Sequence, residues 1–392
     1  MFFARKIYPS LLTHAQTPWV TVLTGMRRTG KTTLIKQTLV DLPNKNVLYL
    51  DLERPDNREL FQQKNYDSIK DAFIARGISP QKPMIIALDE IQLVPLIPSV
   101  IKYLSDHFGI KFIVTGSSSY YLKNLFSESL SGRKKIFELT PLDFGEFLTF
   151  KQIPFAQKDW KKGEFDDVEY SRLSAYYEEY VRFGGFPQVV IAASESEKKD
   201  ALADIMASYI NVDIRSLSDF SDERNVYALV KLLAARIGNR IDYSKLARLT
   251  GLSRPTITNY AAFFEKTYLI QTVLVFSHSI DRQIAKSKKL YFCDTGLANS
   301  LAELSSGAQF ENTVFHQLLH LGEVNYFALK SGQEIDFILE GNVAIEAKET
   351  PTTDDMTRLE RLATRTALSK SRLVGRHKSP TFTNYTWAGS IT

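Results

Sequence analysis

One segment near the start of the chain restricts the possible folds more than any other. Residues 25–32 read Gly-Met-Arg-Arg-Thr-Gly-Lys-Thr, the pattern G-x-x-x-x-G-K-T of a phosphate-binding loop. The apolar run 19–24 in front of it predicts a strand, and the spacing of apolar residues over 31–41 predicts a helix. Strand, glycine loop and helix in this order predict an α/β fold that binds a nucleotide.

Each position of this loop has a chemical reason. Gly25 and Gly30 let the backbone curl so that its N–H groups point at a β-phosphate, and the helix N-terminus adds partial positive charge. We expect Lys31 to reach the β- and γ-phosphates of ATP, and the hydroxyl of Thr32 to bind Mg²⁺. The residues expected to bind ATP are Gly25, Met26, Arg27, Arg28, Thr29, Gly30, Lys31, Thr32 and Thr33.

A second segment supplies the acids that a nucleoside triphosphatase needs. Residues 84–90 read Met-Ile-Ile-Ala-Leu-Asp-Glu, and this apolar run, like the one at 47–51, is typical of a strand buried in a parallel sheet. We expect Asp89, at the strand end, to hold Mg²⁺ through water, and Glu90 to polarise the attacking water. The two segments together predict an ATPase that uses ATP and Mg²⁺.

Two further segments are candidates for completing this site. Residues 111–115 predict another strand, which runs into Thr-Gly-Ser-Ser-Ser. Thr115 and Ser117 are both candidates for orienting the attacking water, and the sequence does not decide between them. Arg133 follows Ser-Gly on a loop before a predicted strand at 134–139. An arginine on such a loop is able to reach the γ-phosphate of a neighbouring subunit and stabilise the transition state.

Composition narrows the class of protein. The chain has 392 residues, enough for two or three domains, and is 44% hydrophobic and 24% charged, as is typical of soluble globular proteins. No apolar run reaches the roughly 18 residues of a membrane span, and the N-terminus lacks a secretory signal, so we expect a cytoplasmic protein without a membrane partner. Cys293, the single cysteine, excludes an internal disulfide and a cysteine-based zinc cluster.

Residues 244–260 carry the spacing of a helix-turn-helix. Ala247 allows close approach of two helices, Gly251 makes the turn, and Ile257 anchors the second helix. Ser253 is placed to cap that second helix. The pattern predicts a DNA-binding unit whose second helix exposes polar side chains.

The segment that follows predicts a wing. Residues 269–276 and 289–292 read as two strands, and the segment between them is basic over 281–288. Although the net charge of +5 is mild, local basic clusters such as this one and 358–378 are able to neutralise phosphates. The residues expected to contact DNA are Arg254, Thr256, Thr258, Asn259, Arg282, Lys286 and Lys288.

The last part of the chain combines carboxylates with a lysine. Residues 310–319 predict an amphipathic helix that carries Glu311 near its start. Asp336 and Glu346 are candidate ligands of a second divalent metal, with Glu311 as a further ligand or orienting group. Lys348 would position an attacking water beside that metal. Such a site either cleaves nucleic acid or only binds it, and the sequence does not decide which.

The turn between two predicted strands determines whether these acids meet. A two-residue hairpin at Gly341-Asn342 pairs Asp336 with Ala347 and sends its carboxylate to the opposite face from Glu346. A three-residue loop over 340–342 pairs Asp336 with Glu346 and brings the carboxylates together. A metal site therefore needs the longer loop or a bulge.

Several of these segments resemble known families. The motifs at 25–32, 84–90 and 115–118, and the Ser-Gly-Arg segment ending at Arg133, look like those of the AAA+ ATPases, and closest to their archaeal-type branch in bacteria and archaea. The Tyr-Val-Arg-Phe-Gly-Gly-Phe-Pro segment at 180–187 also resembles that branch. The resemblance implies a ring, with a hexamer as the expected size and ATP held between subunits. The C-terminal pattern of acids and Lys348 resembles the PD-(D/E)xK nuclease-like fold, implying a domain of unknown function.

The expected fold class is α/β, with a P-loop parallel-sheet core, a helical lid, a winged helix and a restriction-endonuclease-like domain. The expected divisions are 1–150, 151–222, 223–300 and 301–392. The leading hypothesis is an AAA+ ATPase that acts on DNA by junction or branch remodelling, translocation or ATP-coupled processing. The alternative is a nucleotide-gated regulatory or signalling ATPase whose C-terminal domain is an interaction module. A protein-remodelling chaperone ranks last, because no aromatic pore loop is recognisable.

Overall fold

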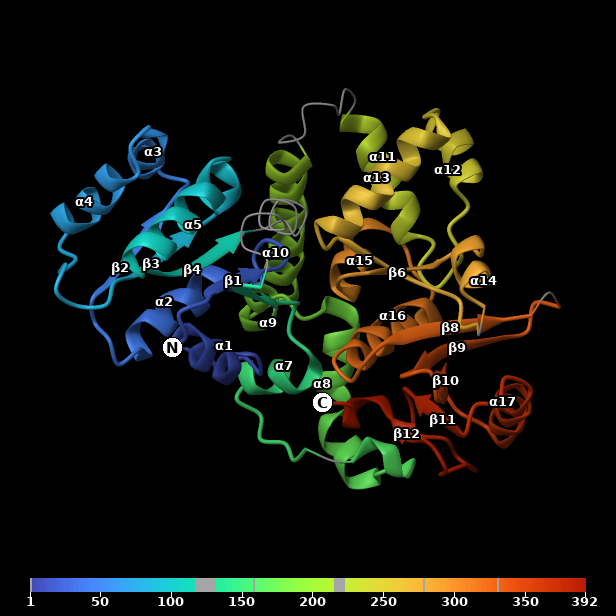
Figure 1. Ribbon diagram of the computed structural model, residues 1–392. Coiled ribbons are helices and arrows are strands. Elements are labelled where there is room, and N and C mark those ends of the chain that lie inside the picture. Colours follow the sequence, from blue (N-terminus) through green and yellow to red (C-terminus); the bar gives the residue numbers. More distant parts are fainter. Residues whose placement is uncertain (1, 117–131, 158, 215–222, 278, 330) are drawn as a thin grey trace. The chain divides into compact units, whose positions relative to one another are not determined.

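The computed structural model describes residues 2–116, 132–157, 159–214, 223–277, 279–329 and 331–392 (Figure 1). The chain forms two compact units. Unit 1 comprises Met1–Thr140 with Lys266–Tyr268, and unit 2 comprises Pro141–Glu265 with Leu269–Thr392.

Unit 1 is built on a five-stranded sheet in which every pair of neighbours is parallel. The strand order is β2-β3-β4-β1-β5. Every residue of β1, β3 and β4 is buried, which explains their continuous apolar sequences. The prediction of a parallel α/β core is therefore confirmed. The bounds are β1 Val20–Thr24, β2 Val47–Asp51, β3 Ile85–Asp89, β4 Lys111–Gly116 and β5 Lys134–Glu138.

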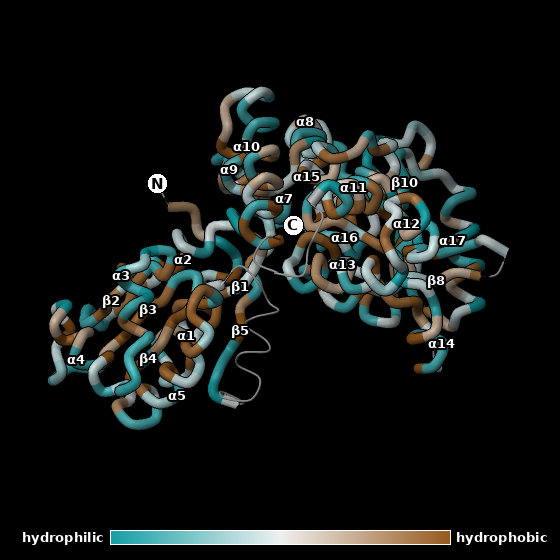
Figure 2. The backbone as a smooth tube through the Cα atoms, turned by 90° about the horizontal axis from the view of Figure 1, so that it is seen from above, coloured by the Kyte–Doolittle hydropathy of each residue, from teal (hydrophilic) through white to brown (hydrophobic). Residues whose placement is uncertain are grey.

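Helices cover both faces of this sheet. One hydrophobic cluster packs α4 and α5 against the strands through residues such as Phe73 and Ile101. A second cluster packs α1 and α2 on the other side through residues such as Leu11 and Ile35. Figure 2 shows hydrophobic stretches, coloured brown, in the part of unit 1 where β3 and β4 are labelled. The bounds are α1 Tyr8–Ala15, α2 Lys31–Asp41, α3 Pro55–Glu59, α4 Asp67–Ala75 and α5 Ile97–Phe108, with 3-10 turns at Leu60–Gln62 and Ile91–Leu93.

Unit 2 begins with a helical layer in which two glycine segments meet. The carboxylate of Asp294 accepts hydrogen bonds from the N–H groups of Gly185, at 2.7 Å, and Leu297, at 2.8 Å. A Cβ atom on Gly184 would lie 2.0 Å from this carboxylate, so only glycine fits there. The bounds are α7 Phe144–Phe150, α8 Asp167–Phe183, α9 Pro187–Ile191, α10 Glu195–Ser208, α11 Glu223–Ala234 and α15 Thr295–Leu301, with a 3-10 turn at Trp160–Lys162 and a π-helical turn at Tyr209–Ile214 after α10.

Two helices and a two-stranded ribbon follow the predicted helix-turn-helix spacing. α12 spans Tyr243–Thr250 and α13 spans Arg254–Lys266, and between them Gly251 has the left-handed φ of 72° that a tight turn needs. Ser253 caps α13 by accepting a hydrogen bond from the N–H of Thr256. β6 Ile270–Val273 and β7 Lys289–Phe292 pair antiparallel. The expected basic connection between them contains a short helix, α14 Ile280–Ala285.

The C-terminal part of unit 2 carries a mixed five-stranded sheet of order β12-β11-β10-β9-β8. β8, β9 and β10 are antiparallel neighbours, whereas β10, β11 and β12 run parallel. α17 packs its apolar face on this sheet. The basic segment 358–378 contains the end of α17 and the strand β11. The bounds are α16 Ser306–Leu319, β8 Val324–Ala328, β9 Glu334–Leu339, β10 Val343–Lys348, α17 Thr353–Arg365, β11 Lys370–Gly375 and β12 Thr386–Trp387, with a last 3-10 turn at Ala388–Ser390.

Candidate functional site

The glycine loop lies at the carboxyl end of β1 and leads into α2. Gly25 has a φ of 145°, and a Cβ atom there would lie 2.1 Å from the carbonyl oxygen of Leu139, so the loop passes too close to the chain after β5 for any other residue. Gly30 caps α2 with a left-handed φ of 99°, and Arg28 also has a positive φ, of 64°. The loop is therefore tightly curled, as a phosphate-binding loop must be.

Lys31 lies inside this curl. Its side chain is almost fully buried, and its Nζ donates hydrogen bonds to the carbonyl oxygens of Gly25, at 2.9 Å, and Met26, at 3.0 Å. Thr29 is buried and donates to the carbonyl of Met26. Arg5 holds the carbonyl of Thr29 from the other side. The ammonium group of Lys31 is thus held against the loop that would bind a phosphate.

Asp89 is the point at which the two nucleotide motifs meet. Its Oδ2 accepts hydrogen bonds of 2.7 Å from the hydroxyls of Thr32 and Tyr49, and its Oδ1 accepts one from Thr115. Burial, and then the hydrogen bond to Asp89, raise the pKa of Tyr49, so the phenol remains a donor. Proteins hold Mg²⁺ beside a nucleotide with a hydroxyl, one or two carboxylates and the phosphates themselves. Thr32 and Asp89 fit that requirement.

Glu90 is held in an unusual backbone conformation next to Asp89. Its φ is 57°, a left-handed value that is uncommon for a residue other than glycine. Its N–H donates to the hydroxyl of Thr115 at 3.1 Å, so Thr115 bridges Asp89 and Glu90. The carboxylate of Glu90 contacts the amide of Gln92 and lies 3.9 Å from the guanidinium of Arg27.

These contacts concern the two hydroxyl residues, Thr115 and Ser117, that are candidates for orienting the attacking water. Thr115 contacts both acids, whereas Ser117 lies outside the described residues. Tyr49 and Gln92 were not predicted from the sequence. Nothing local marks Tyr49, because its relevance depends on β2 lying beside β3, with Asp51 opposite Asp89. Thr33, by contrast, is exposed on the first turn of α2.

Arg133 lies at the amino end of β5. Its carbonyl oxygen accepts a hydrogen bond from the N–H of Val20, the first residue of β1, whereas the glycine loop follows the last residue of β1. Arg133 therefore lies at the amino ends of the strands, whereas the chain's own nucleotide motifs lie at their carboxyl ends. Its side chain is 51% exposed and forms an ion pair with Asp106.

The second group of predicted residues meets on the C-terminal sheet. In the β9–β10 hairpin Leu339 pairs with Val343 and Phe337 with Ile345, so the same register sets Asp336 opposite Glu346. The loop is the three-residue alternative, and Glu340 and Gly341 adopt left-handed φ values of 51° and 63° within it. Asp336 and Glu346 therefore share a face of the sheet.

Cations surround this pair of acids. Oε1 of Glu346 contacts Nζ of Lys348 at 2.9 Å and Nη2 of Arg358 at 2.8 Å. Oε2 of Glu346 is buried and has no hydrogen-bond partner among the described residues. Burial, followed by the charges of Glu311 and Glu346, raises the pKa of Asp336 well above its ordinary value.

Glu311 is compensated by a different cation. Nζ of Lys289, on β7, lies 3.4 Å from Glu311 and 3.2 Å from Glu334, and the hydroxyl of Tyr291 donates to Glu311 at 2.7 Å. In the part of the chain that the structure describes, no group of three or more His, Cys, Asp or Glu is positioned to hold a metal ion. Lys289 and Arg358 were not predicted as partners of these acids, because each reaches its acid from a different element of the fold.

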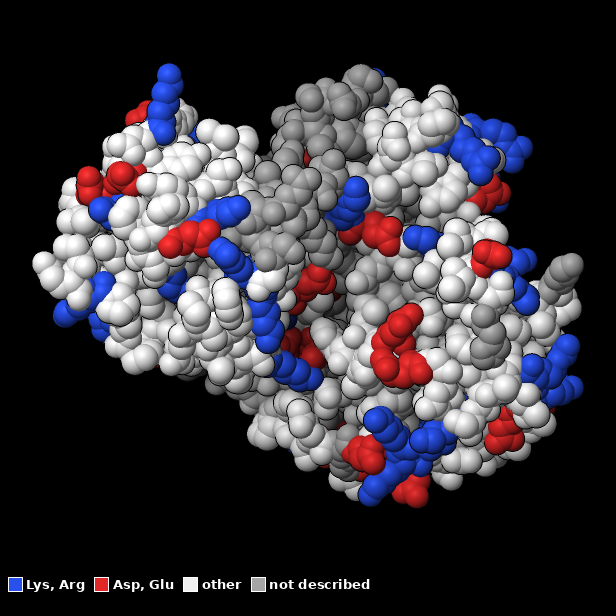
Figure 3. Space-filling view, viewed as in Figure 1, with Lys and Arg blue, Asp and Glu red and all other residues white. Residues whose placement is uncertain are grey.

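The residues predicted to contact DNA are accessible. On α13, Ile257 is buried while Arg254, Thr258 and Asn259 are exposed and Thr256 is half-buried. On the connection between β6 and β7, Arg282 and Lys286 are exposed and Lys288 is half-buried. Figure 3 shows basic side chains over the part of unit 2 where Figure 1 labels α12 and α14.

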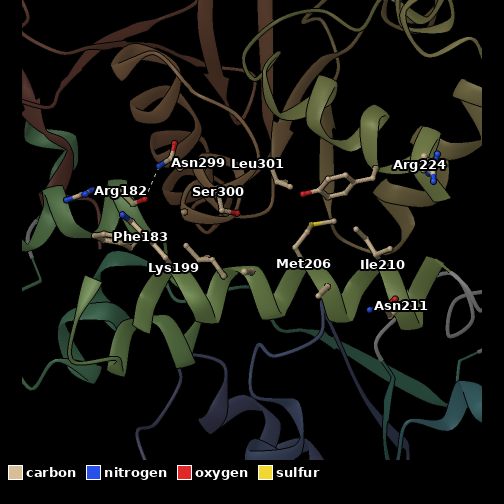
Figure 4. Close-up of a pocket in the computed structure, with 15 residues that line it drawn as sticks. Arg182, Phe183, Lys199, Met206, Ile210, Asn211, Arg224, Asn299, Ser300 and Leu301 are labelled. Carbon is tan, nitrogen blue, oxygen red and sulfur yellow. Dashed lines mark hydrogen bonds between the residues drawn. The ribbon is translucent and has the colours of Figure 1, made fainter. Parts of the chain in front are cut away.

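A separate cavity of about 860 Å³ lies between α10 and α15 in unit 2 (Figure 4). Phe183, Leu202, Met206 and Leu301 give it an apolar lining, to which Arg182 and other polar side chains also contribute. No residue predicted from the sequence as a site residue lines it. This cavity is thus a feature of the fold that the sequence motifs did not indicate.

Comparison with known proteins supports the nucleotide-binding unit. Residues 17–148 match the family described as an AAA domain, and this match spans all five strands of the unit 1 sheet. Residues 174–308 match a family described as a domain of unknown function. Within the described residues no helix is both long and apolar enough to cross a membrane.

Two relatives from other organisms carry no functional name. An uncharacterized protein of Methanocaldococcus jannaschii is 29% identical over 333 residues, covering 82% of this chain and 72% of that protein. An uncharacterized protein of Haemophilus influenzae is 27% identical over 348 residues, covering 84% and 81%. The Aeropyrum pernix Orc1 protein, solved in complex with DNA, has 13% identity and a TM-score of 0.33, covering 77% of this chain and 92% of that one. A TM-score this low does not establish a shared fold.

Proposed function

We propose that the chain is a Mg²⁺-dependent ATP hydrolase of the AAA+ type whose turnover is coupled to DNA. The contact of Asp89 with Thr32, bridged to Glu90 through Thr115, is the observation that carries the ATPase assignment. It brings a loop hydroxyl, a metal-binding carboxylate and a candidate base together at the carboxyl end of a parallel sheet, where α/β proteins bind ligands.

Each residue has a separate role in this proposal. Lys31 turns from the carbonyls of Gly25 and Met26 to the β- and γ-phosphates when nucleotide fills the loop. Thr32 and Asp89 hold Mg²⁺, which when bound supplies positive charge to the transferred phosphoryl group. Glu90 orients and polarises the attacking water, and Thr115 fixes Glu90 relative to Asp89.

The same proposal includes a ring. Arg133 is at the opposite sheet edge from its own glycine loop, which suits action on a neighbour's γ-phosphate rather than on the chain's own. A partially exposed arginine paired to a single acid, Asp106, is able to exchange that partner for a phosphate. We propose assembly into a ring, with a hexamer as the expected size.

The DNA assignment rests on unit 2. α12, α13 and the β6–β7 ribbon support a winged helix, and the exposed polar face of α13 suits a major groove. The C-terminal sheet, with Asp336, Glu346 and Lys348 on neighbouring strands, supports a PD-(D/E)xK-like domain. Because Lys289, Lys348 and Arg358 already neutralise its acids, we propose that this domain binds nucleic acid rather than cleaving it.

That neutralisation also favours a second candidate, in which ATP gates a regulatory assembly and the C-terminal domain is an interaction module. DNA-dependent turnover distinguishes the two. We expect duplex, single-stranded or branched DNA to stimulate ATP hydrolysis several-fold, and Lys31→Ala to abolish both basal and stimulated turnover. Glu90→Gln should keep ATP binding while lowering turnover by about a hundredfold or more. Turnover that responds to no DNA structure would favour the regulatory switch.

A further inference from the structure

A small basic cavity lies under α14, beside the β6–β7 ribbon. It measures about 130 Å³ and is lined by Arg240, Arg282 and Lys286, with Tyr326 and the end of β8 forming the other wall. Arg240 precedes α12, Arg282 and Lys286 come from the connection between the two ribbon strands, and Tyr326 comes from the C-terminal sheet. Three cations from two separate segments thus converge on one hollow.

The backbone around this cavity is fixed by hydrogen bonds. Arg240 forms a β-bridge to Lys289 on β7, and Val275 forms one to Tyr326 on β8. The N–H of Tyr326 donates to Leu274 and its carbonyl accepts from Phe276, at 3.1 and 2.6 Å. Tyr326 is 1% exposed, and its hydroxyl donates to the carbonyl of Ser287. The cavity is therefore a shaped feature between the ribbon and the C-terminal sheet.

The charge of the cavity is uncompensated. Lys289, which forms the β-bridge with Arg240, is paired with Glu311 and Glu334. Arg240, Arg282 and Lys286 have no ion pair with any acid in the described ranges, including Asp281 on the same short helix. Three cationic residues therefore line one small cavity without a paired acid, and an anion in the cavity would offset their positive charge.

The size and donors of the cavity select a class of anion. At about 30 Å³ for one water, 130 Å³ holds a group the size of roughly four waters. Arginine donors in a fixed fork match the oxygen pairs of phosphate, and lysine adds a point charge. We propose that this cavity binds one phosphate group and that, given the proposed DNA function on which this assignment rests, the occupant is a backbone phosphodiester.

This location links two parts of the proposed interface. The cavity adjoins the ribbon that follows α13 and the edge strand β8, which pairs with β9, the strand that carries Asp336. A phosphodiester bound here would guide a DNA strand from the helix-turn-helix toward the sheet face that carries Asp336. Phosphate contacts of this kind set position and register without reading sequence.

The other face of α14 provides a local control. Ile280 and Ile284 are four residues apart, 71% and 76% exposed, and lie on the helix face away from that of Arg282. Replacing both with serine alters α14 without removing a charge. Lys64 and Lys82, exposed on unit 1, provide a second control in which two positive charges are removed elsewhere.

The test compares binding of the full chain to a short fluorescein-labelled duplex and to a labelled single strand across about 50 to 200 mM salt. In Arg240→Gln/Arg282→Gln we expect affinity to fall about tenfold, and the slope of log K against log salt to lessen by about one, the value for one lost phosphate contact. Lys64→Gln/Lys82→Gln and Ile280→Ser/Ile284→Ser should keep the wild-type slope. Circular dichroism and thermal melting of each variant verify folding.

A second arm separates a phosphodiester from free phosphate and does not depend on DNA binding. In Lys31→Ala, which impairs the glycine loop, inorganic phosphate should raise the melting temperature, and adding Arg240→Gln/Arg282→Gln should remove that increase. If the variants with Arg240→Gln/Arg282→Gln keep both the rise in melting temperature and the wild-type slope of log K against log salt, the cavity binds neither ligand. That result would overturn the proposal. If wild-type protein binds no DNA but protection depends on Arg240 and Arg282, the DNA function fails while the phosphate site stands.

Discussion

The phenol of Tyr49 donates a hydrogen bond of 2.7 Å to Oδ2 of Asp89, the same oxygen that accepts from Thr32. Tyr49 and Asp89 belong to neighbouring parallel strands, so the contact crosses from β2 to the end of β3. With Thr115 on Oδ1, both carboxylate oxygens of the aspartate accept hydrogen bonds. Tyr49 is therefore a positioning residue for the proposed Mg²⁺ site.

Removing that phenol should weaken Mg²⁺ use more than protein stability. A hydrogen bond to a charged group contributes about 1.5–3 kcal/mol, and the remaining partners of Asp89 retain part of it. We expect Tyr49→Phe to raise the Mg²⁺ concentration for half-maximal ATP hydrolysis by about threefold to tenfold. Tyr66→Phe, which deletes a phenol elsewhere in unit 1, is the control. Equal Mg²⁺ dependence in both variants would contradict the positioning role.

Thr115 should be sensitive to the loss of its hydroxyl but not of its methyl. Its hydroxyl accepts a hydrogen bond from the N–H of Glu90 and donates one to Asp89, and serine preserves both contacts. We expect Thr115→Ser to keep most activity and Thr115→Val, of similar shape, to lower kcat by about tenfold or more. Single-turnover hydrolysis with saturating ATP measures this step. Equal rates in the two variants would remove Thr115 from the catalytic arrangement.

Local patterns in the sequence were sufficient for the nucleotide-binding unit. The five predicted strands became parallel strands, and the glycine loop connects β1 to α2, because each of these features is encoded within a few consecutive residues. The roles of Tyr49, Lys289 and Arg358 could not be predicted in this way. Each contacts an acid on another element, and the sequence does not state which elements will be neighbours.

The acidic pair shows a different limit. Both possible hairpin registers were consistent with the sequence, and they differ by whether Glu340 joins the loop. Glu340 adopts a left-handed φ of 51°, a conformation uncommon for this residue type, so the choice opposed local preference. α14 was missed because none of its residues is buried, so the helix has no apolar face against the core to give a periodic signal.

Asp294 should give the protein a specific pH dependence of stability. Burial raises the pKa of this carboxyl to about 6, although the N–H groups of Gly185, Leu297 and Gly296 oppose the shift. The folded state therefore holds a proton that the unfolded state releases near its ordinary value of 3.8. Stability due to this group is greatest at low pH and falls as pH rises to about 6, by roughly 3 kcal/mol in total.

Asp294→Asn removes that ionisation while leaving an oxygen to accept from Gly185. The stability difference between wild type and Asp294→Asn, measured by urea unfolding, should shift in favour of the variant as pH rises from about 4 to about 6, and then level off. Asp200→Asn, at an exposed acid on α10, is the control for general charge effects. A pH-independent difference would contradict a raised pKa at Asp294.

The C-terminal domain, which carries these acids, should bind nucleic acid without cutting it. Arg358 and Lys348 occupy Oε1 of Glu346, and Lys289 occupies Glu311, so a metal would have to displace these cations. We expect no cleavage of duplex, branched or single-stranded DNA or of RNA with Mg²⁺ or Mn²⁺, and DNA binding that persists in EDTA when ATP is absent. Gel analysis of labelled substrates tests this. Metal-dependent cleavage lost in Lys348→Ala but kept in Glu90→Gln would establish a nuclease instead.

Arg133 should act only across a subunit boundary. Its position at the amino edge of the sheet keeps it from its own glycine loop, and arginine fingers contribute about 10³–10⁵ in kcat. Arg133→Ala and Lys31→Ala should each be nearly inactive alone, because one lacks the finger and the other the ATP site. Mixing them should restore part of the activity, since Lys31→Ala subunits supply Arg133 to the intact sites of their neighbours. Asp106→Asn, which only frees Arg133 from its ion pair, should retain turnover. A mixture no more active than its components would exclude a shared site.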